Sequence, residues 1–141
     1  MAKTIRVHIV SAESEIWTGE AAMVFASAEQ GAMGIAPRHA PLLTRLEPGE
    51  VRVRTPEGEE LDFFVSGGML EVQPNLVSIL ADTAQRAKDL DEAAAAEAKQ
   101  RAEEAVANRK GDMDLSRAQA ELAEATARLR LIQKMRKKKS S

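Results

Sequence analysis

Residues 51–65 read VRVRTPEGEELDFFV, and this stretch gives the clearest local indication of the fold. Apolar and charged residues alternate from Val51 to Arg54, which is the period of a strand with one buried face. A Thr-Pro-Glu-Gly-Glu loop separates this segment from a second apolar one, Leu61 to Val65. Two such segments joined by a loop with proline and glycine predict a β-hairpin.

Further strands are predicted on both sides of this hairpin. Ile5, Val7 and Ile9 alternate with polar residues, and a polar turn follows them. Residues 69–72 and 76–81 are short apolar segments separated by a Gln-Pro-Asn turn. Short strands with turns at this spacing favour a sandwich or a flattened barrel.

The composition changes after residue 86. All five prolines, every Phe and Trp, and seven of the eight glycines lie before that point, whereas residues 87–141 contain fourteen alanines. The mixture of Ala, Glu, Lys, Arg and Leu in the second part is typical of helices. We therefore predict two domains, a β-sandwich over residues 1–86 and a helical hairpin over residues 87–141.

The predicted hairpin has two helices joined near Gly111. Asp89, with Glu92 three residues later, resembles a capping box, and the first helix is expected to run to about Arg109. The second helix carries apolar residues at spacings of three and four, as in a coiled-coil seam: Leu115, Ala118, Leu122, Ala125, Leu129 and Ile132. The contact face expected on the first helix is nearly all alanine: Leu90, Ala94, Ala98, Ala102 and Val106.

An alanine face gains little from burial compared with the entropy lost on ordering a helix. The hairpin alone should therefore be marginally stable and should need a partner surface, either its own sandwich or a long helix of another protein. The hypothesis that follows is a hairpin that detaches from one surface and docks on the other.

The formal net charge of −2 conceals an asymmetry. Residues 1–86 carry 7 basic and 12 acidic side chains, a net −5, while residues 87–141 carry 13 basic and 10 acidic, a net +3. The basic residues gather at the C-terminal end, where they either stabilise a helix terminus or meet an acidic protein, nucleic acid or anionic lipid. A net acidic sandwich argues against a nucleic-acid adaptor.

Residues suited to catalysis are sparse. The absence of cysteine excludes disulfides and thiolate chemistry. His8 and His39 belong to no cluster with metal-binding spacing, and there is no glycine loop of the phosphate-binding type. The N-terminal residues lack the apolar core of a signal peptide, and no apolar run is long enough to span a membrane. We expect a soluble, cytoplasmic protein that is not an enzyme and holds no metal or other cofactor.

Two neighbouring segments combine glycine and proline. Residues 30–34, QGAMG, are interpreted as turn geometry, since they lead into a loop and not into a helix. Residues 34–43, GIAPRHAPLL, are expected to form a rigid loop that presents Arg38 and His39. On physical grounds His39 serves either a neighbouring backbone group or a protein partner, and the apolar residues Met33 and Ile35 nearby favour a partner.

Four motifs follow one another along the chain and precede the helical hairpin: Ser11-Ala12-Glu13, GAMGIAPRHAPLL at 31–43, SGGMLEV at 66–72 and LADTA at 80–84. In this combination the chain resembles the epsilon subunit family of bacterial F-type ATP synthases, over essentially its whole length. The resemblance implies a flattened sandwich of about ten strands and a two-helix C-terminal domain. It also implies a place in the central stalk, which turns with the gamma subunit and the c-subunit ring.

The resemblance assigns three sets of contact residues. Those expected at the c ring are Glu29, Gln30, Gly31, Ala32 and Met33. Those expected near gamma are Ser11, His39, Ala40 and Pro41. The basic residues expected to face an acidic segment of the catalytic subunits, and so to inhibit ATP hydrolysis, are Arg128, Arg130, Lys134 and Arg136.

Two departures from the family pattern matter. Some relatives have an acidic residue where this chain has Ala32, so an ionic contact to the c ring at that position is not expected, although Glu29 is a substitute. Nucleotide-sensing relatives have an arginine where this chain has Ala94. The alanine cannot make the charge-assisted bond to phosphate that the arginine provides. Asp91 and Arg101 remain as candidate nucleotide contacts, and we expect weak or absent ATP binding.

The function expected from the resemblance is that of a non-catalytic rotor subunit that couples proton flow to ATP synthesis and restrains ATP hydrolysis through its hairpin. The expected partners are gamma, the c ring and the catalytic beta and alpha subunits, on the cytoplasmic side of the inner membrane, with membrane association only through the complex. The alternative is a constitutive structural stalk subunit whose hairpin stays folded. A free nucleotide sensor would need the arginine that Ala94 replaces.

Overall fold

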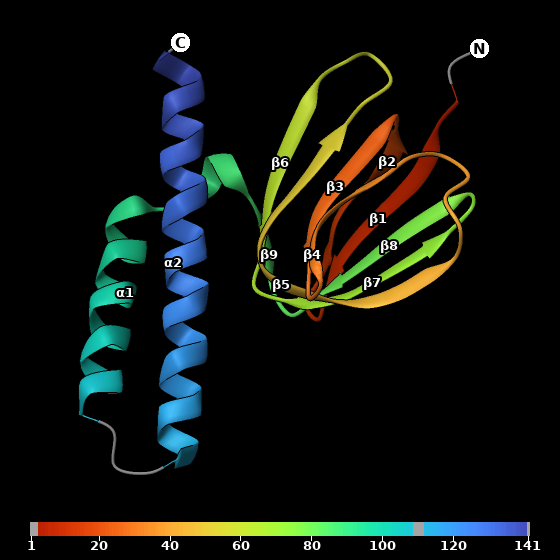
Figure 1. Cartoon of the computed structure of the whole chain (residues 1–141). Coiled ribbons are helices and arrows are strands. Elements are labelled where there is room, and N and C mark those ends of the chain that lie inside the picture. Colours follow the sequence, from red (N-terminus) through yellow and green to blue (C-terminus); the bar gives the residue numbers. More distant parts are fainter. Residues whose placement is uncertain (1–2, 109–111, 141) are drawn as a thin grey trace. The chain divides into compact units, whose positions relative to one another are not determined.

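The computed structural model describes residues 3–108 and 112–140 (Figure 1). The chain divides into two compact units, Met1–Arg86 and Ala87–Ser141. We call the first the sandwich unit and the second the hairpin unit, and each is described by itself.

The sandwich unit consists of short strands, as the alternating segments predict. Its strands are β1 Ile5–Ser11, β2 Glu15–Ala21, β3 Met23–Ala28, β4 Gly31–Ile35, β5 Leu42–Arg54, β6 Glu60–Val65, β7 Gly68–Gln73, β8 Leu76–Ala81 and β9 Ala84–Arg86. The predicted fold class is confirmed, with nine strands among the described residues where the resemblance implies about ten.

The strands pair in the order β2-β1-β8-β7-β5-β3-β4, and β6 pairs with both β5 and β9. Strand β5 joins the two layers, because its first part pairs with β7, from Leu42 to Leu46, and its last part pairs with β3 and β6. Pro48, which has no N–H to donate, lies between the two paired parts. The predicted hairpin is confirmed as β5–β6, with Arg54 opposite Glu60.

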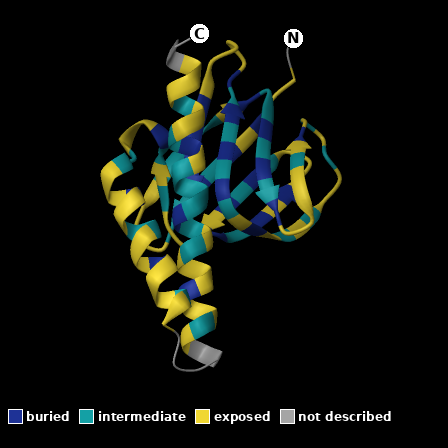
Figure 2. Ribbon diagram, turned by 60° about the vertical axis from the view of Figure 1, so that its left-hand side comes forward, coloured by how far each residue is buried: buried dark blue, intermediate teal, exposed yellow. Residues whose placement is uncertain are grey.

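The core of the sandwich unit consists of large apolar side chains that alternate with outward residues along each strand (Figure 2). Phe63 is fully buried, and the Trp17 ring lies with its centroid 6.2 Å from that of Phe63. Burial of each such side chain stabilises the fold by about 1.5–3 kcal/mol. The fully buried members include Ile5, Val7, Ile9, Val24, Ile35, Val51, Val53, Leu70, Val72, Val77 and Ile79.

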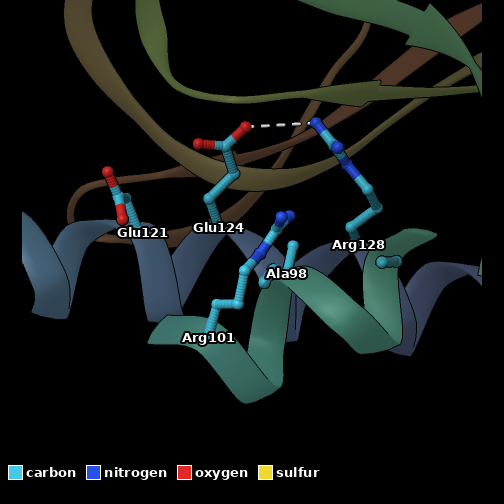
Figure 3. A pocket seen from close by; sticks show the side chains of 7 residues that line it. Ala98, Arg101, Glu121, Glu124 and Arg128 are labelled. Carbon is cyan, nitrogen blue, oxygen red and sulfur yellow. Dashed lines mark hydrogen bonds and ion pairs between the residues drawn. The ribbon is translucent and has the colours of Figure 1, made fainter. Parts of the chain in front are cut away.

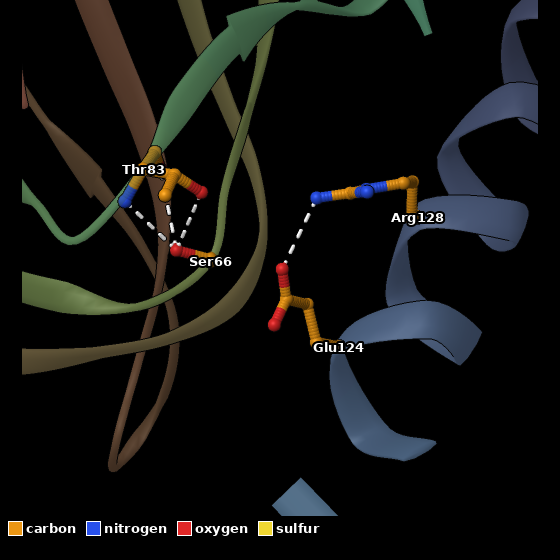
Figure 4. A network of polar contacts seen from close by, with 4 residues as sticks. All are labelled: Ser66, Thr83, Glu124 and Arg128. Carbon is orange, nitrogen blue, oxygen red and sulfur yellow. Dashed lines mark hydrogen bonds and ion pairs between the residues drawn. The ribbon is translucent and has the colours of Figure 1, made fainter. Parts of the chain in front are cut away.

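Two of the motifs that carry the resemblance meet in the sandwich unit. The backbone and side chain of Thr83 both donate to the hydroxyl of Ser66, each at 2.8 Å, and Ser66 donates from its backbone to the Thr83 carbonyl at 3.0 Å (Figure 4). Gly68 has a φ of +139°, and a Cβ there would lie 2.2 Å from the carbonyl oxygen of Leu80. The glycine therefore lets β7 pass this close to β8.

The hairpin unit contains a short 3-10 turn, η1 Ala87–Asp89, and two helices, α1 Glu92–Ala107 and α2 Asp112–Ser140. The predicted cap, Asp89, is wrong. The N-cap is Asp91, whose side chain accepts a hydrogen bond from the Ala94 N–H at 3.2 Å, because Asp89 still belongs to η1. The predicted C-terminal glycine, Gly111, and the predicted helix end, Arg109, lie outside the described residues.

The predicted contact face of α1 is shifted by one position at its start. Ala95 and Ala102 are buried, whereas Ala94 is exposed, because the helix begins after Asp91 and not after Asp89. On α2 the predicted seam holds. Its alanines, Ala118 and Ala125, are buried, and its large members are partly buried: Leu115, Leu122, Leu129 and Ile132. Within the described residues, no helix is both long and apolar enough to cross a membrane.

Candidate functional site

The residues predicted to face the c ring lie at the β3–β4 connection. Glu29 and Gln30 form the exposed turn, and the backbone N–H of Glu29 donates to the carbonyl of Arg45 at 2.9 Å. The interpretation of QGAMG as a turn is wrong for most of its length, because Gly31–Ile35 pairs with β3 as strand β4. Gly31 has a φ of +124°, which glycine adopts readily at the start of such a strand.

A cavity of about 280 Å³ opens beside this connection. Four of the five predicted residues line it, all except Glu29, together with the start of β5: Ala28, Gln30, Gly31, Ala32, Met33, Leu42, Leu43 and Thr44. Met33 and Leu42 pack against the core, while Leu43 is 64% exposed. The cavity therefore combines small residues, an exposed leucine and the polar side chains of Gln30 and Thr44, which suits a protein loop better than an ion.

Leu43 was not among the predicted contact residues. A signal was present, since one of two adjacent leucines in a strand must face outward. A large apolar side chain held in solvent beside a cavity marks an interaction surface.

The loop between β4 and β5, residues 36–41, is held by backbone hydrogen bonds. Arg38 donates from its backbone to the Pro74 carbonyl at 2.9 Å, and His39 donates to the Ala36 carbonyl at 3.2 Å. The His39 ring nitrogen Nδ1 lies 2.7 Å from the Ala40 carbonyl oxygen. A backbone partner therefore accounts for Nδ1 of His39, while Nε2 has no partner among the described residues. Ile35, which was expected to favour a protein contact, is instead fully buried in the core.

Ser11 lies far from this loop, although both are predicted near gamma. Ser11 pairs with Ala81 at one end of β1 and β8, whereas the loop is bonded to Pro74, beyond the opposite end of β8. At about 3.3 Å per residue the two ends are roughly 20 Å apart. A single partner that reaches both must therefore extend along the sheet.

The outer face of the sheet carries an apolar row that crosses three strands close to the Ser11 end. Val10 on β1 is opposite Leu80 on β8, which is opposite Met69 on β7. Leu80 is 53% exposed, one of the two most exposed large hydrophobic residues among those described, and Val10 and Met69 are partly exposed. Sequence reasoning missed this row, because its three members come from strands that only the fold brings side by side.

In the hairpin unit, a cavity of about 320 Å³ lies between the helices (Figure 3). It is lined by Ala95, Ala98, Arg101, Glu121, Glu124, Ala125 and Arg128. Arg101 extends from α1 toward α2, and Arg128 forms an ion pair with Glu124 at 3.1 Å. Two cations and two carboxylates line the cavity, so its formal charge is balanced.

The structure does not bring the two candidate nucleotide contacts together. Asp91 caps the N-terminus of α1 and does not line the cavity, whereas Arg101 lies ten residues further on, or about 15 Å along the helix. Glu124, which sequence reasoning did not single out, occupies the place beside Arg128 that a phosphate would need.

The four predicted inhibitory residues do not form one patch. Arg128 lines the cavity, while Arg130, only two positions on, faces another side of α2 and is exposed. Lys134 is exposed as well. Arg136 forms an ion pair with Glu92, which connects the end of α2 to the start of α1.

A second cavity, of about 240 Å³, lies at this end of the hairpin unit and is lined by Ala87, Lys88, Leu90, Ile132, Met135 and Arg136. Across residues 3–108 and 112–140, no group of three or more His, Cys, Asp or Glu side chains is arranged to hold a metal ion.

Comparisons with known proteins decide the family. Residues 4–87 match the model for the beta-sandwich domain of the ATP synthase Delta/Epsilon chain, and residues 82–133 match the model for its long alpha-helix domain. The ATP synthase epsilon chain of Nitrosococcus oceani is 64% identical over 138 residues, which cover 98% of this chain and 99% of that protein. The chain belongs to the ATP synthase epsilon chain family.

Further relatives agree with this assignment. The epsilon chain of Alkalilimnicola ehrlichii is 62% identical over 135 residues, 96% of each chain. A chain of the Euglena gracilis mitochondrial ATP synthase, solved by cryo-EM as an OSCP/F1/c-ring assembly, has a similar fold, with a TM-score of 0.79 at 19% identity over 88% of this chain and 78% of that one. The resemblance is confirmed, and this epsilon chain is a subunit of an F-type ATP synthase.

Proposed function

We propose that this chain is a non-catalytic rotor subunit of the central stalk, which couples proton translocation to ATP synthesis and restrains ATP hydrolysis through its C-terminal helices. The observation that carries the proposal is the contrast between its two units. A sandwich with a large apolar core suits the transmission of torque, whereas a hairpin packed mainly on alanines suits a part that rearranges.

The sandwich unit supplies the coupling contacts. Its β3–β4 connection and the cavity beside it, with Leu43 at the rim, meet the loops of the c ring. Gamma lies along the outer face of the sheet from Ser11 to the loop of His39, Ala40 and Pro41. The exposed apolar row of Val10, Met69 and Leu80 supports this arrangement at its Ser11 end, because it lies one residue from the pairing of Ser11 with Ala81.

The hairpin unit supplies the restraint on hydrolysis. Arg130, Lys134 and Arg136 are all exposed, and Arg130 and Lys134 meet an acidic segment of the catalytic beta and alpha subunits. Arg128 and Arg136 already form ion pairs with Glu124 and Glu92, so they exchange these partners when the hairpin opens. The energetic difference between the two arrangements is therefore small, as a reversible brake requires.

The chain itself carries out no reaction, takes no metal or other cofactor, and binds ATP weakly if at all. The balanced charge of the interhelical cavity supports this, since an anion entering it must compete with two carboxylates, Glu121 and Glu124. Its place is the cytoplasmic side of the bacterial inner membrane, as a peripheral subunit held by its partners, and it has no role in binding nucleic acid.

Reconstitution tests the proposal. Full-length protein, and separately a version that ends at Arg86, are added to the matching ATPase core stripped of this subunit, and ATP hydrolysis is measured. Inhibition by the full-length protein alone supports the brake. Equal behaviour of the two would favour a constitutive structural subunit whose hairpin stays folded.

A full-length variant separates the cations from the helices that carry them. Arg130→Gln with Lys134→Gln should relieve most of the inhibition without unfolding the hairpin, as circular dichroism can verify. The matched control is Lys99→Gln with Lys88→Gln, which removes two cations from η1 and α1. Equal relief by both pairs would mean that net charge, and not the α2 contact, is responsible.

A further inference from the structure

Arg38 occupies a backbone conformation that side chains rarely adopt. Its φ is +66°, and among residues 3–108 and 112–140 it is the only non-glycine residue with a positive φ. The left-handed region brings the Cβ of an L-residue close to the following carbonyl, so a glycine or asparagine at this position would be less strained. An arginine here lowers the stability of the fold and has no evident structural purpose.

The strain is maintained by the surrounding loop. The Arg38 N–H is bonded to the Pro74 carbonyl at 2.9 Å, and the His39 N–H to the Ala36 carbonyl at 3.2 Å. Prolines at 37 and 41 fix φ on both sides of the pair. The loop is therefore rigid at Arg38, where the backbone is strained. Strained residues held by a rigid surrounding structure cluster at binding sites.

The side chain of Arg38 is exposed and has no ion pair or hydrogen bond within the described part of the chain. A neighbour provides a contrast. Arg6 flanks the same turn, since its N–H is bonded to the Asn75 carbonyl at 3.2 Å, but its guanidinium is paired with Glu20 at 3.3 Å. One arginine at this end of the sandwich unit is thus satisfied internally, and the other is left for a partner.

We infer that Arg38 is a partner-binding residue, whose guanidinium pairs with a carboxylate of the gamma subunit when the sandwich docks on the stalk. A guanidinium on a rigid loop loses little freedom on binding, and its charge-assisted bonds to a carboxylate are about twice as strong as neutral ones. The inference rests on the proposed function, which assigns the adjoining residues His39, Ala40 and Pro41 to gamma.

Geometry favours gamma over the c ring as the source of that carboxylate. The proposed c-ring surface is at the β3–β4 connection, which precedes β4, whereas the Arg38 loop follows the other end of that strand. The two loops therefore leave β4 from opposite ends, and the Arg38 loop lies outside the proposed c-ring surface.

The test separates the charge of Arg38 from its strain. Three full-length variants, Arg38→Asn, Arg38→Gly and Arg38→Lys, are titrated against the matching F1 core that retains gamma but lacks this subunit. Asn and Gly relieve the strain and remove the charge, so affinity should fall about tenfold in low salt while Tm rises by roughly 1–4 °C. Arg38→Lys keeps both the positive charge and the backbone strain, so its affinity should stay within about threefold of the wild-type value and its Tm should not change.

The matched control is Arg6→Gln, which removes the neighbouring cation and should change affinity by less than about twofold. The inference would be overturned if Arg38→Asn and Arg38→Gly bound the F1 core with wild-type affinity. It would also be overturned if Arg6→Gln lost as much affinity as they do. A loss of affinity for the isolated c ring with no change for the F1 core would overturn it as well. A wild-type protein that does not bind the F1 core would contradict the proposed function itself, whatever the role of Arg38.

Discussion

The two units of this molecule are stabilised in different ways. The sandwich unit buries β-branched and aromatic side chains, and the fit of its strands depends on single glycines. In α1 and α2, the buried residues described are Leu131 and four alanines, Ala95, Ala102, Ala118 and Ala125. A buried methyl group contributes about 0.8 kcal/mol, against about 1.5–3 kcal/mol for a buried Val, Leu or Phe. The sandwich unit is therefore expected to behave as a rigid body, and the hairpin unit to rearrange at a lower cost in free energy.

The largest expected effect is at Gly68. Gly68→Ala places a Cβ 2.2 Å from the Leu80 carbonyl oxygen and 2.8 Å from the Ala81 Cα, at a φ of +139°. Because both obstacles are backbone atoms, β7 and β8 must separate, and we expect the free energy of unfolding to fall by about 3 kcal/mol or more. Urea denaturation followed by Trp17 fluorescence measures it.

The matched control is Gly34→Ala, the same change on an exposed part of β4. Its Cβ would meet only side-chain atoms, the Met23 Cε at 3.3 Å and the Phe25 Cε1 at 3.4 Å. A change of less than about 1 kcal/mol is expected. If the two substitutions were equally tolerated, the sandwich would be far more plastic than its packing indicates.

The second effect concerns the hairpin alone. Ala102→Glu puts a carboxylate at a buried position of α1, seven residues after Ala95, which lines the interhelical cavity. The hairpin should lose about 2 kcal/mol or more and most of its helicity, since the charge has no room for water. The sandwich should keep its unfolding midpoint. Circular dichroism at 222 nm and Trp17 fluorescence follow the two units separately.

Ala105→Glu is the control, because Ala105 is exposed on the same helix. It should leave helicity within about a tenth of the wild-type value, as surface substitutions usually do. Loss of the sandwich together with the hairpin in Ala102→Glu would contradict the independence of the two units.

Local sequence pattern predicted much of the fold. The β5–β6 hairpin follows from alternation around a Pro-Glu-Gly turn, and the change from sandwich to helix follows from composition. The misses have local causes. Residues 30–34 were interpreted as turn geometry because their glycines lead into a loop with prolines, whereas the pairing of Gly31–Ile35 with β3 overrides that tendency. Asp89 was chosen as the cap because Glu92 lies three residues after it, but Asp89 belongs to η1 and the helix begins after Asp91.

The candidate site was predictable only where it is contiguous. The β3–β4 connection and the loop at 36–41 are short segments, so sequence named them. The row of Val10, Met69 and Leu80 depends on the register of three strands, which local sequence does not give. The pairing of Glu124 with Arg128 lies within α2 at a spacing of four residues, so the sequence carried a signal for it. The strain at Arg38 could not be anticipated, because arginine itself carries no preference for a positive φ.

A smaller effect is expected at the ion pair between α1 and α2. Arg136→Gln removes the partner of Glu92, but both side chains are well exposed, at 64% and 41%. Exposed pairs contribute about 0–1 kcal/mol, so amide exchange in the first turn of α1 should quicken by less than about fivefold. Arg130→Gln, an exposed cation on the same helix, should leave that exchange unchanged. A tenfold or greater acceleration would make this pair the main restraint on the hairpin.

The smallest effect is expected from ATP. A nucleotide phosphate entering the interhelical cavity would have to displace Glu124 from Arg128, and Ala94, next to the lining residue Ala95, offers it no cation. Calorimetry on the full-length protein should therefore show no affinity tighter than about 1 mM, and ATP should leave amide exchange in α1 and α2 unchanged.

A double variant, Ala94→Arg with Glu124→Ala, tests whether the charges in and beside the interhelical cavity are the cause of the weak ATP binding. It adds a phosphate partner on α1 and releases Arg128 on α2, so it should bind ATP at least about tenfold more tightly than the wild-type protein. Sub-millimolar binding by the wild-type protein would mean that the carboxylates of the cavity do not compete with phosphate. Unchanged weak binding by the double variant would mean that the cavity lacks the shape for a nucleotide, whatever its charge.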